Sequence, residues 1–403
     1  MWAVIISLIV PLLIWGPFFP DLIVSLSSLI FLVYLFRKNE FYYFNNKVVV
    51  IFFSFCIYCI LLSIFIAKNT SLSFESSLFY FRIGIFACLI WCLIDQNKKI
   101  LTYFYYALVV CFVVLIVDGY IQFFTGTNII GFSKSGVRIS SFFGDELIIG
   151  SYLSRLFPLL FALFVFKEKK QLELYSMSIL FILLSGLIYI SGERAAFFLF
   201  ILSYMFMMIF LEKFVKLKII LSVLSLFLIV LLTSNFSEVK NRMLSSPANT
   251  IKKSIFTPEH DSLIRTAYNM FLDKPILGHG PKMFRVICKD EKYAVGITPC
   301  MTHPHNFYVQ LLAETGIIGF SFLFSAFAYV LYCAYRQFKS IVLRQKRYLT
   351  DYQVCLLAGI LITVWPLTTN GNFFHNWLMI VYSLPVGFYL HSFYGKNRKN
   401  ISF

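Results

Sequence analysis

The sequence predicts an all-α fold, a polytopic bundle of about twelve membrane-spanning helices with a small helical cap outside the membrane. Of the 403 residues, 59% are hydrophobic and only 13% are charged, whereas about 25% of the residues of a soluble domain are charged. Apolar runs long enough to cross about 30 Å of hydrocarbon recur along the chain. These runs are continuous and do not alternate with polar residues, which excludes a membrane β-barrel.

The first apolar run lies at the N-terminus, in MWAVIISLIVPLLIWGPFFP. It lacks the basic start and the small-residue cleavage site of a signal peptide, so we predict a spanning helix that is broken near Pro11. The predicted spans are 2–16, 19–36, 48–67, 77–94, 101–123, 147–166, 174–190, 195–212, 218–233, 306–335, 353–369 and 377–394.

Basic residues are distributed unevenly between the short loops. One alternate set of loops, with the C-terminal tail, holds 19 Lys and Arg residues, whereas the other set holds only Lys68, Lys134, Arg138 and Arg194. Because cytoplasmic loops carry the excess of Lys and Arg, the bias predicts that both termini are cytoplasmic. The net charge of +16 then reflects membrane topology, and we expect no nucleic-acid partner.

The loop between the ninth and tenth spans is 72 residues long and faces outward by the same count. It contains a predicted amphipathic helix, in which Ile264, Ala267, Tyr268 and Phe271 recur at helical spacing. We therefore divide the chain into 1–233 with nine spans, a cap of 234–305, and 306–403 with three spans and a basic tail.

Seven of the nine cysteines lie in apolar spans, where cysteine acts as a small hydrophobic residue. Two of them form CIYC at 56–59, whose place inside a span argues against a zinc site. Cys288 and Cys300 lie in the outward loop, where an oxidising compartment would let them form a disulfide. The alternative is two unpaired thiols.

Ionisable residues inside spans are costly and usually mark function. Arg82 and Arg155 lie in the outer parts of their predicted spans, and Arg194 lies on a short outer loop. In an alternative interpretation, Arg82 and Arg155 pair with Asp118 and Glu146 as structural ion pairs. Five of the six histidines also fall in predicted outer loops.

An outward cavity with several arginines and neutral histidines suits an anionic substrate anchored in lipid, such as a diphosphate at headgroup level. Arginine binds phosphate oxygens in pairs and stays charged. A neutral histidine can take a proton from an attacking hydroxyl. The sequence has no Asp-x-Asp motif for a metal-bound nucleotide sugar, so we expect neither a metal nor a cofactor.

The stretch CMTHPHNFYVQLLAETGIIGF places His303, His305 and Asn306 at the outer mouth of the tenth span. His305 is the candidate base, although a structural hydrogen bond to the cap would also explain it. His303 precedes Pro304, which forces extended backbone, so it either binds the ligand or supports the turn. Asn306 is first of all a helix N-cap, with ligand contact as an addition.

Two arginines also have two interpretations each. Arg194, in SGERAA, either binds the ligand or reaches the lipid headgroups. Arg265, on the amphipathic helix, either binds the ligand or is an ordinary solvated residue. GHG at 278–280 is interpreted as a turn and not as a phosphate-binding loop.

These residues together resemble the bacterial O-antigen ligases and O-antigen polymerases, which are polytopic inner-membrane glycosyltransferases with a long periplasmic loop. The resemblance rests on an arginine of the outer helix, then PILGHG, then HPHNFYVQLLAETGIIGF, with SGERAAFF and RISSFFGDELIIGSYLSRLFP earlier in the chain. It covers roughly residues 135–320 and more weakly 370–390.

The resemblance implies transfer of a glycan from undecaprenyl diphosphate to an acceptor hydroxyl at the periplasmic face of the inner membrane. His305 matches the family's candidate base, and Arg194 and Arg265 match its diphosphate-binding arginines. Lipid A-core is the expected acceptor of a ligase, and a growing glycan that of a polymerase. One long outer loop favours the ligase. A lipid-linked glycan transporter is less favoured, because the charges lie near one surface and not at the midplane.

Overall fold

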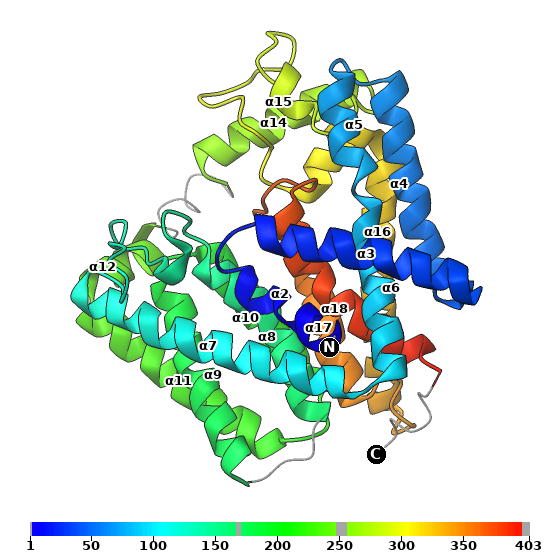
Figure 1. Cartoon of the computed structure of the whole chain (residues 1–403). Coiled ribbons are helices and arrows are strands. Elements are labelled where there is room, and N and C mark those ends of the chain that lie inside the picture. The colour runs from blue at the N-terminus through cyan, green and yellow to red at the C-terminus, as the bar shows by residue number, and fades with distance from the viewer. Residues whose placement is uncertain (1, 167–170, 247–255, 397–403) are drawn as a thin grey trace.

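The computed structural model describes residues 2–166, 171–246 and 256–396, which fold almost entirely as helices (Figure 1). The α-helices are α1 (Trp2–Ser7), α2 (Ile9–Leu12), α3 (Phe18–Lys38), α4 (Lys47–Phe65), α5 (Thr70–Leu78), α6 (Phe81–Gln96), α7 (Lys99–Thr125), α8 (Ile149–Phe166), α9 (Gln171–Ile190), α10 (Arg194–Phe210), α11 (Val215–Asn235), α12 (Ser237–Lys240), α14 (Pro258–Asp273), α15 (Phe284–Ile287), α16 (Phe307–Val342), α17 (Asp351–Thr363) and α18 (Asn376–Tyr394). Three short helical turns are η1 (Phe41–Phe44), η2 (Ser141–Phe143) and η3 (Asn241–Ser245).

The described chain has eight helices that are long and apolar enough to cross a membrane. They are α3, α4, α5 with α6, α7, α8, α9, α11 and α16. Trp2–Leu12, α10 and α17 are apolar but shorter, and α18 coincides with the last predicted span. Every predicted span overlaps one of these helices, so the chain is a multi-pass membrane protein, while the total of twelve spans stays a prediction.

Side-chain caps fix several helix starts. Asn46, Asn69 and Thr350 accept hydrogen bonds from backbone N–H groups of the first turns of α4, α5 and α17, which would otherwise have no partner. The fourth span was expected at 77–94. In the structure its helical segment begins at Thr70, because Asn69 starts the additional helix α5 ahead of α6.

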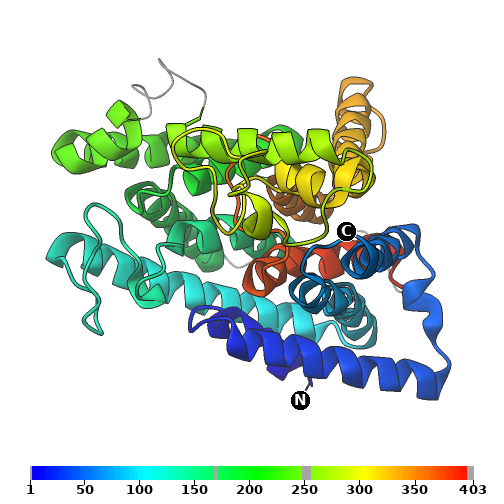
Figure 2. The ribbon, with the colours of Figure 1, turned by 90° about the horizontal axis from the view of Figure 1, so that it is seen from above.

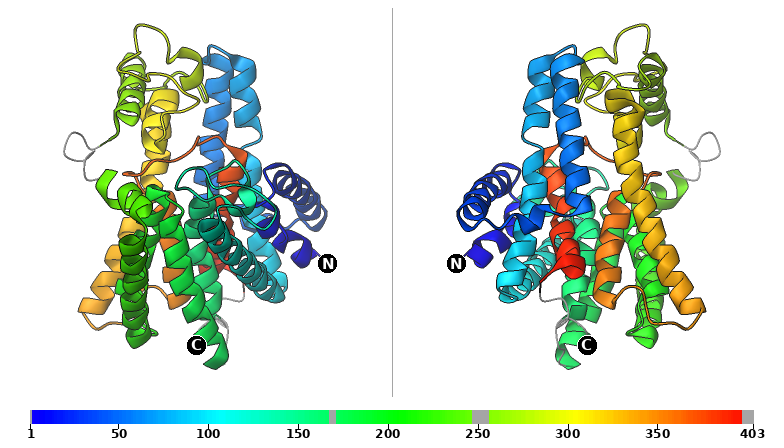
Figure 3. Two further views of the ribbon diagram at one scale, coloured as in Figure 1. Left: turned by 90° about the vertical axis from the view of Figure 1, so that its left-hand side faces the viewer. Right: turned by 90° about the vertical axis from the view of Figure 1, so that its right-hand side faces the viewer.

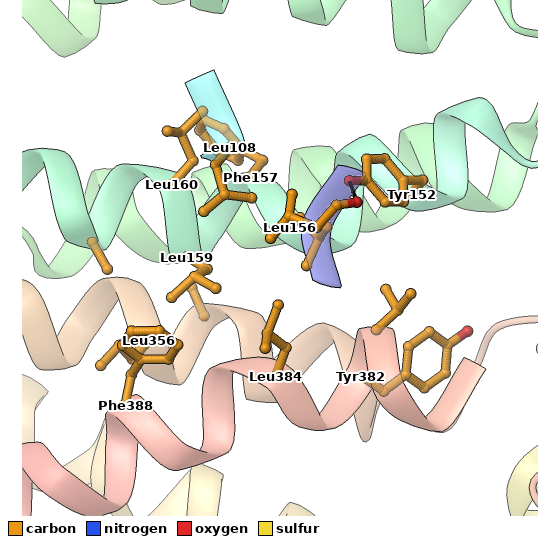
Figure 4. Packing of buried hydrophobic residues seen from close by; sticks show 14 of the residues in the cluster. Leu108, Tyr152, Leu156, Phe157, Leu159, Leu160, Leu356, Tyr382, Leu384 and Phe388 are labelled. Carbon is orange, nitrogen blue, oxygen red and sulfur yellow. Dashed lines mark hydrogen bonds between the residues drawn. The ribbon is translucent and has the colours of Figure 1, made fainter. Parts of the chain in front are cut away.

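The core lies where α8, α17 and α18 meet. Leu159 of α8 lies near Leu356 of α17 and Phe388 of α18, while Leu160 lies on the other side of α8 beside Leu108 of α7 (Figure 4). By contrast, the outer helices expose much apolar surface, and only 22% of the most apolar 18-residue stretch of α11 is buried. Exposed apolar side chains on long helices are what a hydrocarbon surrounding requires.

The predicted cytoplasmic loops share one end of the molecule. The Tyr42 hydroxyl donates to the carbonyl of Tyr394, and the Lys396 backbone donates to Asp95. The Glu212 backbone N–H likewise donates to Asp351. Which side of the membrane this end faces stays a prediction. Lys167, Lys169, Lys170, Arg398 and Lys399, which contributed to the charge count, lie outside the described residues.

The segment predicted as the cap lies at the opposite end, where α14 and α15 lie beside the start of α16 (Figure 2), and its place outside the membrane stays a prediction. The helices α4 and α5 rise to the same level (Figure 3), and Lys68 in the turn between them lies 3.8 Å from Asp290 of the cap. The buried face of α14 consists of Ser262, Leu263, Thr266, Ala267 and Met270.

The predicted apolar face of the cap helix was therefore partly wrong, because Tyr268 is 52% exposed. Spacing alone identified an amphipathic helix, but its buried face depends on what it packs against. That surface includes Phe284 of α15 and Ala313 of α16.

Candidate functional site

One large cavity of about 1500 Å³ opens at the cap end. Its walls come from all parts of the chain, since the α2–α3 turn, α8, α10, α14 and the loops before α8, α16 and α18 all contribute. The arginines, carboxylates and histidines that line it are Arg138, Arg155, Arg194, Arg242, Arg285, Glu146, Glu193, His260, His303, His305 and His375. Arginines thus outnumber carboxylates on its walls, which suits an anionic ligand.

Three imidazole rings lie close together in this cavity. The ring centroids of His303 and His305 are 4.1 Å apart, and that of His260, from the cap helix, is 5.4 Å from His305. Thr257 and Thr302 hold the Nδ1 atoms of His260 and His303 at 2.9 and 2.8 Å.

Burial favours the neutral form of these three rings. It lowers the pKa of His305 from its usual 6.5, with a further lowering by His260 that a hydrogen bond to the Asn370 backbone opposes. Burial also lowers the pKa of His260 and lowers that of His303 to about 3. Neutral imidazoles are the form that can accept a proton.

The backbone at His305 is fixed from both sides. His305 has a φ of 57°, a left-handed conformation that is uncommon for a residue other than glycine. Its carbonyl accepts from the backbone N–H of Asn370 at 2.8 Å. Next to it, the Asn306 side chain accepts from Tyr308 and Val309, so it is the N-cap of α16. These contacts hold the imidazole at the mouth of α16.

Asn306 also ties α16 to the loop before α18. Its Nδ2 donates to the carbonyls of Pro366 and Thr368 at 2.8 and 3.2 Å. Asn306 is 8% exposed and does not line the cavity. The structure thus gives Asn306 the cap role, and it places His303 and His305 on the cavity wall.

A cluster of three arginines lies on the other wall, around the α9–α10 turn. A side-chain carbon added to Gly192 would lie 3.0 Å from Cγ of Arg138 and 3.6 Å from Cγ of Arg242, so both arginines pack on this glycine. Arg138 donates to the carbonyl of Leu147, Arg242 to that of Gly192. Both lie close enough to Arg194 to repel it electrostatically.

Glu193 does not offset the positive charge of this arginine cluster fully, because it also caps α8. Its carboxylate accepts from the backbone N–H of Gly150 at 2.6 Å and from both the backbone and hydroxyl of Ser151. Carboxylates are favoured at a helix N-terminus. The arginine cluster therefore keeps an excess of positive charge toward the cavity.

Arg155 lies in the cavity floor and is only 4% exposed. Its Nη1 and Nη2 donate to the carbonyl of Ile362 and to Oδ1 of Asn370 at 3.1 and 2.9 Å. The guanidinium lies 3.8 Å from the centre of the Tyr382 ring. Neither expected ion-pair partner, Asp118 or Glu146, pairs with Arg155.

The structure does not bring Arg82 and Arg265 into the cavity. Arg82 pairs with Asp21 of α3 at 2.5 Å and donates to Ser25. Arg265 lies 3.7 Å from Asp261 with 62% of its side chain exposed. It shares α14 with His260, but five residues of helix turn the two side chains to different faces.

Cys288 and Cys300 are joined by a disulfide. In the sequence the bond lies between Arg285 of α15 and His303, two residues that line the cavity. The turn at GHG packs against α16, where Gly280 donates to the carbonyl of Glu314 at 2.7 Å. Gly316, with a φ of 64°, kinks α16 at this contact, and a side chain there would clash with the backbone of Ile276.

Sequence reasoning missed several cavity residues, namely Arg138, Arg242, Arg285, Glu193 and Asn370. The outer-loop charge count included Arg138 but gave it no role. The other arginines lie in the long loop, where nothing in the spacing marks which cations turn inward.

Comparisons with known proteins found one matching family model and a distant relative. A family model described as O-antigen ligase matches residues 179–324. The chain is also similar to the teichuronic acid biosynthesis protein TuaE of Bacillus subtilis (strain 168), with 24% identity over 119 residues, 30% of this chain. The matched part spans only 24% of the length of that relative. This multi-pass membrane protein therefore carries, over residues 179–324, the domain of the O-antigen ligase family of enzymes.

Proposed function

We propose that the protein is a glycosyltransferase that moves a glycan from undecaprenyl diphosphate to an acceptor hydroxyl at the periplasmic face of the bacterial inner membrane. The observation that carries this proposal is the cavity itself, in which an arginine cluster faces a group of neutral histidines. Its volume of about 1500 Å³ exceeds that of ordinary small-molecule pockets, roughly 300–1000 Å³, and leaves room for two glycan substrates.

The arginine cluster of Arg138, Arg194 and Arg242 binds the diphosphate in this proposal. Guanidinium groups form charge-assisted, paired hydrogen bonds with phosphate oxygens. The charge on the bridging oxygen grows as the lipid diphosphate leaves, so cations placed there stabilise the transition state. Arg155 supports the floor, and Arg82 and Arg265 take no part because they lie elsewhere.

His305 is the base. It takes the proton of the acceptor hydroxyl while that oxygen attacks the anomeric carbon, and the bond to the diphosphate oxygen breaks in the same displacement. The electron pair leaves with undecaprenyl diphosphate, and the proton stays on His305 until solvent removes it. A direct displacement of this kind inverts the anomeric centre. In this proposal the arginines, and not a metal ion, supply the positive charge.

The acceptor distinguishes two forms of this function. We propose a ligase that attaches the glycan to lipid A-core, because the chain has one long outer loop and not two. A repeat-unit polymerase is the second candidate, favoured by the similarity to a protein whose name places it in teichuronic acid biosynthesis. A transporter is disfavoured, since the buried charges of the cavity lie at one end of the bundle.

A gel profile of surface lipopolysaccharide from a strain lacking the gene tests the proposal. A ligase predicts lipid A-core without repeat units, and a polymerase predicts core that carries a single unit. Plasmid-borne wild type should restore the ladder in either case. An unchanged ladder in the deletion strain would contradict both forms.

A further inference from the structure

The loop 366–375 before α18 carries the sequence PLTTNGNFFH and lines the cavity with Asn370 and Asn372. These asparagines are each 5% exposed. Buried carboxamides almost always have partners for both their oxygen and their nitrogen. The orientation and the partners of the two side chains therefore indicate what the loop can bind.

The Asn370 side chain is oriented by Arg155. A guanidinium can only donate, so the group that Arg155 contacts at 2.9 Å must be the carboxamide oxygen. The amide nitrogen Nδ2 then faces the other way. It is buried and has no hydrogen-bond partner, although Asn370 lines the cavity. An unpartnered buried donor beside an open cavity is the mark of a group reserved for a ligand.

The Asn372 side chain is oriented in the same way by a second chain of contacts. Its Oδ1 accepts from Nε2 of Gln310 at 3.0 Å and from the backbone N–H of Phe374 at 2.8 Å. Gln310 is itself fixed, since its Oε1 accepts from Phe373 and its Nε2 also donates to Glu314. The oxygens of both side chains are thus held by protein partners, and both residues line the cavity.

The place of Asn370 identifies which substrate its nitrogen meets. Its backbone N–H donates to the carbonyl of His305 at 2.8 Å, so the Asn370 side chain stands beside the proposed base. The arginines of the cluster take no part in this contact, since Arg138 and Arg242 pack on Gly192. A group bound by Nδ2 of Asn370 is therefore a neighbour of the imidazole.

We propose that Asn370, with Asn372 beside it, binds the acceptor glycan through neutral amide-to-hydroxyl hydrogen bonds and places the attacking hydroxyl against His305. The ligand class is an uncharged, polyhydroxylated sugar, because the NH2 groups donate and carry no charge. The N–H of Asn370 also stabilises the negative charge that grows on the hydroxyl oxygen as its proton moves to His305. This inference rests on the proposed function.

The substitution Asn370→Asp tests it sharply. A carboxylate still accepts from Arg155, so the floor of the cavity stays intact, but it cannot donate to the acceptor and repels the developing charge. Losing one neutral hydrogen bond lowers kcat/KM for the acceptor by roughly fivefold to tenfold. Initial rates are measured with purified full-length protein, with undecaprenyl-diphosphate-linked glycan as donor and lipid A-core from the deletion strain as acceptor.

The expected result is a fivefold or greater loss in kcat/KM for the acceptor, with the KM for the donor within twofold of wild type and an unchanged Tm. Asn372→Asp should lower the same parameter less. Asn235→Asp makes the same chemical change on the exposed end of α11 and should leave all rates unchanged. Asn370→Ala also removes the amide hydrogen-bond donor and, in addition, leaves Arg155 without its carboxamide partner. Comparing its Tm with that of Asn370→Asp separates loss of the hydrogen bond from loss of the fold.

Unchanged acceptor kinetics in Asn370→Asp would overturn the inference, as would a change confined to the donor KM. A wild-type protein that transfers no glycan to lipid A-core or to a second lipid-linked glycan would overturn the proposed function, and the inference with it. The two failures are thus distinguishable, because the first needs an active wild type.

Discussion

Both ends of the molecule are rich in basic residues, but the two ends differ in how far these residues are buried. At the cap end, Arg138, Arg194 and Arg242 are partly buried around one turn and line a cavity. At the opposite end, Arg336 and Arg344 are exposed, and the Arg336 guanidinium lies 4.8 Å from the centre of the Tyr348 ring. The first arrangement leaves positive charge facing an enclosed space, and the second leaves it in solvent.

This difference shows that the number of cations predicts sidedness and not a site. Solvent screens exposed charges within about 10 Å, so the arginines of the opposite end contribute little to binding an anion. Partial burial strengthens the electrostatic attraction of the cap-end arginines for a phosphate. The following predictions test whether the two ends differ in this way.

The largest effect is expected for His305→Ala. Removing a general base typically costs 10²- to 10⁴-fold in rate, so this variant should leave the deletion strain without a restored ladder. His303→Ala should cost less, because His303 does not contact the acceptor proton in this account. Expression is checked by immunoblot of membranes, and full rescue by His305→Ala would end the proposed mechanism.

Next in size are substitutions in the arginine cluster. Arg194→Ala, Arg138→Ala and Arg242→Ala each remove charge-assisted hydrogen bonds to the diphosphate, worth about 1.5–3 kcal/mol apiece. The affinity for undecaprenyl diphosphate should fall by roughly tenfold to a hundredfold. Arg336→Ala and Arg344→Ala remove the same charge from the other end and should have no effect. Equal losses at both ends would erase the distinction drawn here.

The disulfide should have a moderate effect. Cys288 and Cys300 are separated by 12 residues, and a loop of this length adds about 3 kcal/mol of stability. Cys288→Ser, Cys300→Ser and the double variant should destabilise the cap equally, as measured by protease resistance of the segment 256–306. If the double variant were much less resistant to protease than either single variant, the two cysteines would have separate roles.

The smallest effect is a shift in the pH profile. Burial and His260 lower the pKa of His305 below 6.5, so the neutral base persists to lower pH than a solvated histidine would. The rate of transfer at pH 6.5 should therefore still exceed about half of its value at pH 7.5, and it should fall further at more acidic pH, as His305 takes up a proton. A loss of half the rate or more by pH 6.5 would show that His305 has no lowered pKa.

The sequence predicted the helices well because long apolar runs have few alternatives in a membrane. It also pointed to His303, His305 and Arg155, which line the cavity, since buried charge and a proline-flanked histidine pair are unusual locally. The direction of a helix face could not be predicted, so Arg265 lies outside the cavity and His260, on the same helix, lines it. Arg82 could not be assigned either, because Asp21, its partner, lies on another helix.

Asn370 is a second residue whose role could not be predicted from the sequence. Nothing in TTNGNFFH distinguishes an asparagine that binds substrate from one that supports a turn. Only the approach of Arg155, which is 215 residues away in the sequence, fixes its oxygen and leaves its nitrogen free.

The most direct test of the account is a transfer reaction with purified protein in lipid nanodiscs, followed by measuring both products. The account predicts that undecaprenyl diphosphate is released in equal amount to the glycan joined to the acceptor, and that neither appears when the acceptor is omitted. Release without an acceptor, or loss of the donor without any new glycosidic bond, would contradict it.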